Sequence, residues 1–166
     1  MPLSMYQSSI PVLLRGLNNL SAVLKKGEAQ DGGTALVEAR LAPDMFTLAG
    51  QVQRASDTAK GCAARLSGLA NPSFPDEEKT FAELQARIAM TIDFIKTATP
   101  AQVDGSEGRP IEFKAGPNVL KFTGESYLQT FVIPNFFFHA TAAYAILRHN
   151  GVPLGKLDYL GGDTGG

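Results

Sequence analysis

Apolar residues recur at alternating steps of three and four over most of the chain, the spacing that keeps one face of an α-helix against a partner. The first series covers residues 3–24 and predicts a long helix that ends at Gly27 and the pair Gly32-Gly33. Pro11 lies inside this series, and a proline removes a backbone hydrogen-bond donor. We therefore expect either a kink at Pro11 or a later start of the helix.

Two further helices are predicted by the same spacing. The second covers residues 45–69 and is expected to begin at Asp44, where a carboxylate meets unpaired backbone N–H groups. The third is expected to begin near Asp76, because the run Asp76-Glu77-Glu78 would complement the positive end of a helix dipole. Each of these two helices has one apolar face.

The periodicity changes between Arg109 and Thr123, where two short apolar runs flank the turn residues 115–118. This pattern predicts a β-hairpin. A last helix is expected from Gly124 to Asn150, with Pro134 inside it and an apolar surface nearly all round. The predicted fold class is all-α: a four-helix bundle with a small β-hairpin inserted before the last helix.

Length and composition fit one ordinary globular domain. The chain has 166 residues, of which 44% are hydrophobic and 19% charged, so we expect a single domain over residues 1–161 and a flexible tail over 162–166. The formal net charge is -1, and no basic run is dense enough to neutralise several phosphates. A nucleic-acid partner is therefore not expected.

The cysteine content and the N-terminus bear on location. Cys62 is the one cysteine of the sequence, so it has no partner for an internal disulfide, and we expect it to pack as a small hydrophobic residue. The N-terminus lacks the charged and apolar regions of a secretory signal. No run of about 18 uncharged apolar residues is present either. We expect a cytoplasmic protein without a membrane span.

Two polar side chains interrupt the apolar last helix. Asn135 and His139 lie one turn apart on a single stripe. Burying either without a partner costs roughly 1 to 3 kcal/mol, so each needs one. One reading is structural: a satisfied core histidine, and an asparagine that repairs the backbone carbonyl of Thr130, which Pro134 leaves free. The other reading makes His139 a ligand or an acid/base group in a pocket.

The second helix offers polar groups that would face the same space. Asp44 and Gln51 are seven residues apart and flank an apolar stripe that is rich in alanine. Small alanine side chains either let another helix approach closely or leave room for a ligand. The candidate ligand-binding residues are therefore His139, Asn135, Gln51 and Asp44.

A conventional metal site is not predicted. His139 and His149 would lie about 100° and about 15 Å apart on one helix, so they cannot share an ion. His149 is better placed to interact with the C-terminal end of the helix dipole. An ion at His139 would need oxygen ligands such as Asp44, with Gln51 as a weaker one, and that set is unusual for zinc. Phosphate-binding loops and nucleophile elbows are also absent from the sequence.

Several segments of the sequence resemble the DUF1993 family, bacterial proteins of unknown function that are similar to the DinB/YfiT-like four-helix bundles. The resemblance covers residues 5–161. It rests on Arg40-Leu41-Ala42-Pro43-Asp44-Met45-Phe46, Gln51-Val52-Gln53, Asp57-Thr58-Ala59-Lys60, Ala64-Arg65-Leu66, Thr80-Phe81-Ala82-Glu83-Leu84, Pro134-Asn135-Phe136-Phe137-Phe138-His139 and Leu147-Arg148-His149-Asn150-Gly151-Val152-Pro153-Leu154-Gly155-Lys156.

The wider DinB-like group typically holds a metal with one histidine on its second helix and a His-x-x-x-His pair on its last. In this sequence His139 matches the first histidine of the pair, but Ala143 stands in place of the second and Gln51 on helix two. Two of the three ligands are missing, so the metal-dependent thiol transferase chemistry of DinB relatives does not carry over. The resemblance implies a bundle, a pocket between helices two and four, and a homodimer.

Three hypotheses follow for the function. The first is a protein that binds a small molecule between helices two and four, near His139, without the three-histidine metal site. The second is a divergent hydrolase or transferase that uses His139 and a divalent metal such as zinc or nickel, and the cofactor is left open. The third is a homodimeric structural or interaction module. Whether the protein is an enzyme stays open at this point.

Overall fold

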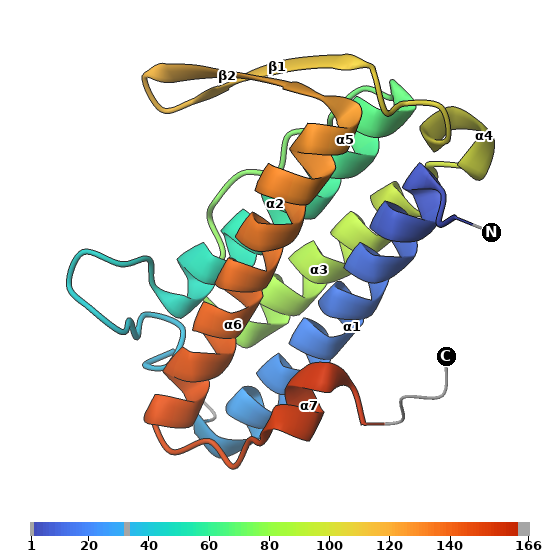
Figure 1. Ribbon diagram of the computed structural model, residues 1–166. Coiled ribbons are helices and arrows are strands. Elements are labelled where there is room, and N and C mark those ends of the chain that lie inside the picture. The colour runs from blue at the N-terminus through green and yellow to red at the C-terminus, as the bar shows by residue number, and fades with distance from the viewer. Residues whose placement is uncertain (1, 32–33, 163–166) are drawn as a thin grey trace.

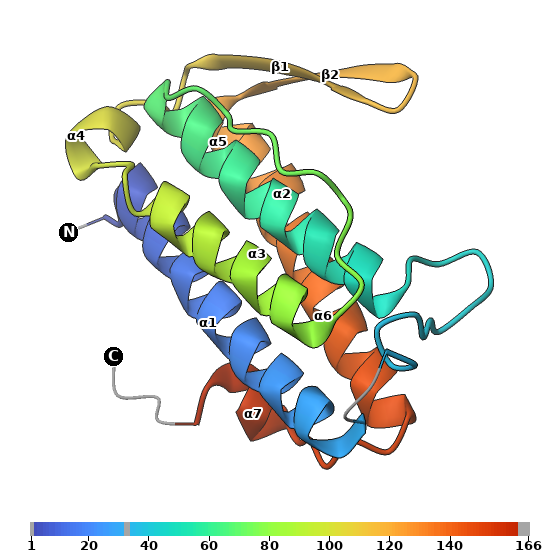
Figure 2. The ribbon, with the colours of Figure 1, turned by 180° about the vertical axis from the view of Figure 1, so that it is seen from behind.

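Long helices packed side by side make up most of the molecule (Figure 1, Figure 2). The computed structural model describes residues 2–31 and 34–162. The elements follow one another as α1 (Met5–Asp31), α2 (Leu48–Ser67), α3 (Phe81–Ile95), α4 (Pro100–Val103), β1 (Pro110–Ala115), β2 (Asn118–Thr123), α5 (Gly124–Tyr127), the π-helix η1 (Leu128–Val132), α6 (Ile133–His149) and α7 (Lys156–Leu160).

The long helices surround one apolar core. α2 packs against α3 and α6, and α1 packs against α3 and α6 in turn. The largest apolar side chains that are fully buried between them include Ile10, Leu13, Leu17, Leu24, Leu48, Leu66, Leu84, Ile88 and Phe136. The mostly helical fold is confirmed. The expected count of four helices is not, because α4, α5, α7 and η1 add short helical segments.

The first helix differs from the prediction at two points. α1 begins at Met5 and continues through Pro11, so the helix does not start late. Pro11 and Gln7 are both exposed, so water can satisfy the Gln7 carbonyl that the proline leaves without a donor. Gly27 lies inside the helix rather than at its end. A Cβ there would lie 2.9 Å from a methyl group of Leu147, so the glycine allows close packing. The expected stop at Gly32-Gly33 lies outside the described residues.

The second and third helices begin later than the acidic residues indicated. α2 starts after Thr47, whose Oγ1 accepts a hydrogen bond from the backbone N–H of Gly50 at 3.1 Å. α3 starts after Thr80, which forms a capping box with Glu83. The predictions that Asp44 and Asp76 begin these helices are therefore wrong. In both helices a threonine hydroxyl accepts a bond from one of the first backbone N–H groups, which is the role that the carboxylates were expected to take.

The acidic residues before α3 serve a tertiary contact instead. Arg87 of α3 is fully buried, and its guanidinium pairs with Asp57 of α2, and with Asp76 and Glu78 of the connecting segment, each at 3.0 Å. Its Nε also donates to the hydroxyl of Ser56 at 3.1 Å. This network ties α2, α3 and the connector together.

The predicted β-hairpin is confirmed. β1 and β2 pair antiparallel, with Ala115 opposite Asn118, and Gly116 in the turn takes a positive φ of 58°. Figure 1 shows the hairpin lying across the ends of α2 and α5. A two-stranded sheet is marginal alone. Its support is an aromatic cluster in which Phe113 packs on the rings of Tyr127 and Phe131, 5.6 and 5.1 Å away between centroids.

The last helix runs as predicted from Gly124 to His149, in three consecutive segments. Its π-helical turn, η1, ends two residues before Pro134. There the N–H of Ile133 bonds to the carbonyl of Leu128, one residue further back than in an α-helix. This change of register lets the helix continue past the proline, whose ring would otherwise crowd the preceding turn.

This helix is also the one whose length and composition would suit a membrane. Among the described residues, an 18-residue stretch of the helix Gly124–His149 has a mean hydropathy of 1.4, and 44% of that stretch is buried inside the protein. The sequence led us to expect no helix that could cross a membrane. By length and composition alone, this helix could. The core helix of a water-soluble protein passes the same test, and α6 packs against α1 and α2.

Candidate functional site

His139 and Gln51, which the sequence placed on different helices, meet in the structure. His139 projects from α6 toward α2 and is 7% exposed. Its Nδ1 lies 2.7 Å from Oε1 of Gln51, which is 1% exposed. The Gln51 amide nitrogen in turn donates to the backbone carbonyl of Phe46 at 3.4 Å. The two side chains thus form a buried polar contact between α2 and α6.

The hydrogen bond fixes the protonation state of the ring. An amide oxygen only accepts, so Nδ1 of His139 carries a proton, and in the uncharged ring Nε2 then keeps a free lone pair. Burial, together with the positive charge of Arg54, lowers the pKa of His139 from 6.5 to about 4. At neutral pH the ring is uncharged, and Nε2 is a hydrogen-bond acceptor.

Asn135 has a partner other than the expected one. Its amide nitrogen donates to Oγ1 of Thr58 on α2 at 2.7 Å, and that hydroxyl donates to the carbonyl of Arg54 at 2.8 Å. This contact therefore does not support the suggestion that the Asn135 side chain bonds to the free carbonyl of Thr130. Asn135 and His139, which are one turn apart on α6, thus both form polar bonds to side chains of α2.

Two exposed aromatic side chains flank His139. Phe46 precedes α2 and is 53% exposed, and its ring lies edge-on to the imidazole at 6.2 Å between centroids. The ring of Phe138, which is 56% exposed, lies 5.2 Å from the imidazole between centroids. Arg54 also packs on Phe46, with its Cζ 5.8 Å from the ring centre. The sequence interpretation missed Phe46, Phe138 and Arg54, although Arg54 is one turn after Gln51.

Asp44 does not join this cluster. It is exposed on the loop before α2 and lines a separate groove of about 380 Å³, together with Arg40, Phe46, Gly50 and other residues of that loop and helix. Phe46 is the side chain that borders both the groove and His139. Arg40 holds the loop by donating to the backbone carbonyls of Pro43 and Met45.

His149 and Cys62 lie outside this site. His149 is exposed in the last turn of α6, the position that suits interaction with the helix end. Cys62 is fully buried, and burial raises the pKa of its thiol to about 12, so it stays protonated. The expectation that Cys62 packs as a small hydrophobic residue is confirmed.

The residues around His139 do not form a metal centre of the ordinary kind. Among residues 2–31 and 34–162 no group of three or more His, Cys, Asp or Glu side chains is close enough to hold an ion. His139 is bonded to Gln51 through Nδ1, and Asp44 lies on the groove side of Phe46. The donor set thus does not fit a catalytic zinc, which commonly has three protein ligands.

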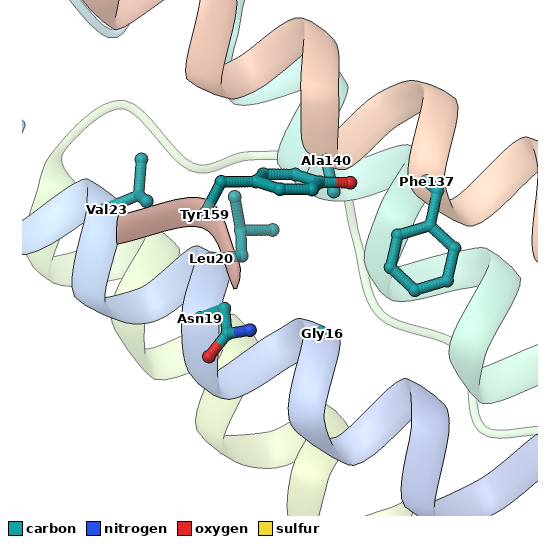
Figure 3. A pocket seen from close by; sticks show the side chains of 7 residues that line it. All are labelled: Gly16, Asn19, Leu20, Val23, Phe137, Ala140 and Tyr159. Atoms are coloured by element: carbon teal, nitrogen blue, oxygen red, sulfur yellow. The ribbon is translucent and has the colours of Figure 1, made fainter. Parts of the chain in front are cut away.

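A second hollow lies on a different face of α6. Figure 3 shows it between α1 and α6, with the ring of Tyr159 from α7 lying over it. Its volume is about 20 Å³, room for a single water molecule, and Leu20, Val23, Phe137 and Ala140 make it mostly apolar. The C-terminal helix α7 thus packs back onto the long helices, but this cavity is too small for a metabolite.

The fold and sequence have relatives. Residues 5–160 match the family described as "Domain of unknown function (DUF1993)". The crystal structure of a DinB family member protein from Shewanella denitrificans superposes with a TM-score of 0.84 at 38% sequence identity. That alignment covers 96% of this chain and 93% of the other. No curated protein matches the chain. Because the family match spans nearly the whole sequence, the protein belongs to the DUF1993 family.

Proposed function

We propose that this DUF1993 protein binds a small molecule at His139, between α2 and the last long helix, α6. The observation that carries the proposal is the state of the imidazole. Nδ1 is satisfied by Gln51, while Nε2 has no hydrogen-bond partner among the described residues. Among the described residues Nε2 is not one of the buried polar atoms that lack a partner, so solvent reaches it and a ligand can take the place of water there. A bound molecule with an N–H or O–H group would satisfy it.

The surroundings supply the other properties of a binding site. Phe46 and Phe138 offer exposed aromatic surface next to the imidazole. The groove of about 380 Å³ beyond Phe46 is within the volume range of small-molecule sites. Asp44 lines that groove, so it would contact a different part of the ligand from Gln51 and His139. Asn135 would hold α6 in place through Thr58 rather than touch the ligand.

A thermal-shift screen with a metabolite library tests this proposal. We expect at least one compound to raise the melting temperature of the wild-type protein, and His139→Ala to abolish that rise. His149→Ala is the matched control, since His149 is exposed and distant in sequence from the site contacts. It should keep the wild-type response. Hits that raise the melting temperature of His139→Ala as much as the wild type would refute the proposal, as would the absence of any hit.

A divergent metal-dependent hydrolase or transferase remains an alternative, with weaker support. It would need His139 Nε2 as a ligand and oxygen donors that the side chains near it do not supply in sufficient number. Elemental analysis of protein purified without a His tag decides the point. About one equivalent of zinc or nickel, lost in His139→Ala, would favour this alternative over the binding of a small molecule alone.

A homodimer is a second candidate arrangement. The observation in its favour is the exposure of Phe46 and Phe138, because aromatic residues are enriched in interface cores. Light scattering on protein at micromolar concentration separates monomer from dimer. A cytoplasmic location is also part of the proposal, and cell fractionation of the native host tests it.

A further inference from the structure

Two opposite charges line the groove beyond Phe46 without pairing. Arg40 and Asp44 both border this hollow of about 380 Å³, and both side chains are exposed. Among residues 2–31 and 34–162, neither forms an ion pair with the other or with any further side chain. The Asp44 carboxylate has no hydrogen-bond partner in that part of the chain either. Both charges are therefore available to a ligand.

The loop that carries the two residues is fixed by its own bonds. The backbone N–H of Leu48 donates to the carbonyl of Ala39 at 2.8 Å. The guanidinium of Arg40 donates through Nη1 to the carbonyls of Pro43 and Met45, at 3.2 and 3.1 Å. Its Nε and Nη2 make no hydrogen bond to the residues that the structure describes. The cation is thus held in place and keeps two donor atoms unused.

The separation of these charges favours one class of ligand. Of the described residues that line the groove, Arg40 and Asp44 are the charged ones, so their charges sum to zero. A ligand with a single charge is attracted by one of them and repelled by the other, so much of its Coulomb energy cancels. A ligand with both charges is attracted twice. The planar guanidinium also suits a carboxylate, which can accept two parallel N–H bonds.

We propose that the part of the ligand in this groove is a zwitterion, with a carboxylate and an ammonium group as in an amino acid. The carboxylate accepts hydrogen bonds from Arg40, and the ammonium group pairs with Asp44. Phe46 lines the same groove and is half exposed, so it offers an aromatic surface to the apolar part of the molecule. The inference rests on the proposed function, in which the groove holds a part of the ligand, and it names the chemistry of that part.

Three probes with the same phenyl ring test the inference by titration calorimetry at pH 7: free phenylalanine, phenethylamine and phenylpropionate. The first carries both charges, the second lacks the carboxylate, and the third lacks the ammonium group. We expect phenylalanine to bind at millimolar concentration and about two- to fivefold more tightly than either of the others, since an exposed ion pair contributes about that factor.

The variant Asp44→Asn removes the negative charge and keeps the size of the side chain. We expect it to weaken phenylalanine binding about two- to fivefold, and to leave phenylpropionate binding unchanged or tighter, because the carboxylate of that probe is no longer repelled. Asp93→Asn is the matched control, since Asp93 is exposed on α3 and has no ion pair among the described residues. It should leave both affinities unchanged.

The variant Arg40→Gln should give the opposite result. It removes the positive charge, so phenylalanine binding should weaken about two- to fivefold while phenethylamine binding stays the same or becomes tighter. Arg40 also bonds to the loop, so a melting curve checks that the fold is kept. Asp44→Asn needs no such allowance, because its carboxylate makes no contact that the fold depends on.

Equal affinities for the three probes, no binding of phenylalanine, or equal effects of Asp44→Asn and Asp93→Asn would overturn the zwitterion assignment. The library screen keeps this failure separate from failure of the proposed function. If a library compound needs His139 while the probes show no discrimination, the site at His139 stands and the zwitterion falls. If no compound needs His139, the proposed function is refuted whatever the probes show.

Discussion

At the scale of single residues, the site depends on one imidazole that is kept neutral. His139 donates through Nδ1 to Gln51, and this leaves Nε2 free for a ligand. The sequence allowed His139 and Gln51 to be chosen as neighbours, because each is a polar residue on or beside the apolar face of its helix. Phe46 and Arg54 could not be chosen in the same way. Their positions depend on the course of a loop and on ion pairs with residues far along the chain.

The pKa of His139 predicts how stability depends on pH. Burial lowers the pKa in the folded protein to about 4, whereas the unfolded chain keeps about 6.5. Between these values the unfolded state binds more protons, so the free energy of unfolding falls as the pH drops from 6.5 toward 4. We expect this group to contribute a loss of about 1 to 2 kcal/mol between pH 7 and pH 5. Urea unfolding at the two pH values measures it.

Two variants isolate the contribution of His139 from that of the carboxyl groups. His139→Gln does not titrate, so its stability should fall less between pH 7 and pH 5 than that of the wild type. His149→Gln removes the exposed histidine and should keep the wild-type difference. An identical pH dependence in wild type and His139→Gln would show that His139 is not held neutral by burial.

At the scale of helices and loops, the sequence located each long helix but not where α2 and α3 begin. The spacing of apolar residues determines which face is buried, so the cores of these helices were predictable. The first residues of these helices were not predictable, because Asp44 and Asp76 are residue types that often cap helices. Only the folded structure shows that Asp76 pairs with Arg87 instead. One signal was available: the Thr80-x-x-Glu83 pattern is the capping box that does begin α3.

The Arg87 network predicts a large cost for its loss. Arg87→Met would leave the mostly buried Glu78 without a cation, while Asp57 and Asp76 would keep Arg54, and we expect a loss of about 3 kcal/mol in the free energy of unfolding. Lys121→Met is the control, because the pair of Lys121 with Glu112 on the hairpin is exposed, and it should cost less than about 1 kcal/mol. Urea denaturation gives both values, and equal costs would contradict the structural role of Arg87.

The junction of hairpin and last helix predicts a difference between two glycines. A Cβ on Gly124 would lie 1.9 Å from the backbone carbonyl oxygen of Ser106, whereas a Cβ on Gly108 would meet nothing within 4 Å. Gly124→Ala must therefore displace backbone, and we expect a loss of about 2 kcal/mol or more. Gly108→Ala should change stability by less than about 1 kcal/mol. Equal urea midpoints for the two variants would show that this close approach does not matter.

At the scale of the whole molecule, the fold was largely predictable and the function was not. Four segments with helical periodicity and one with strand periodicity are α1, α2, α3, the last helix and the hairpin. The short helix α4 escaped prediction because four residues carry no clear period. The likeness to the DinB family member protein from Shewanella denitrificans extends over nearly the whole chain. The metal-ligand pattern expected of the wider DinB-like group stops at His139, since Gln51 and Ala143 occupy the other two positions.

The most direct test of a ligand site at His139 is nitrogen NMR of the ¹⁵N-labelled imidazole rings at pH 7, during titration with a compound from the library screen. The account predicts that His139 is neutral with the proton on Nδ1, and that its Nε2 resonance moves as the compound binds. The nitrogen resonances of the His149 ring should not move. A His139 that is protonated on Nε2, or one whose Nε2 resonance stays fixed while the compound binds, would contradict it.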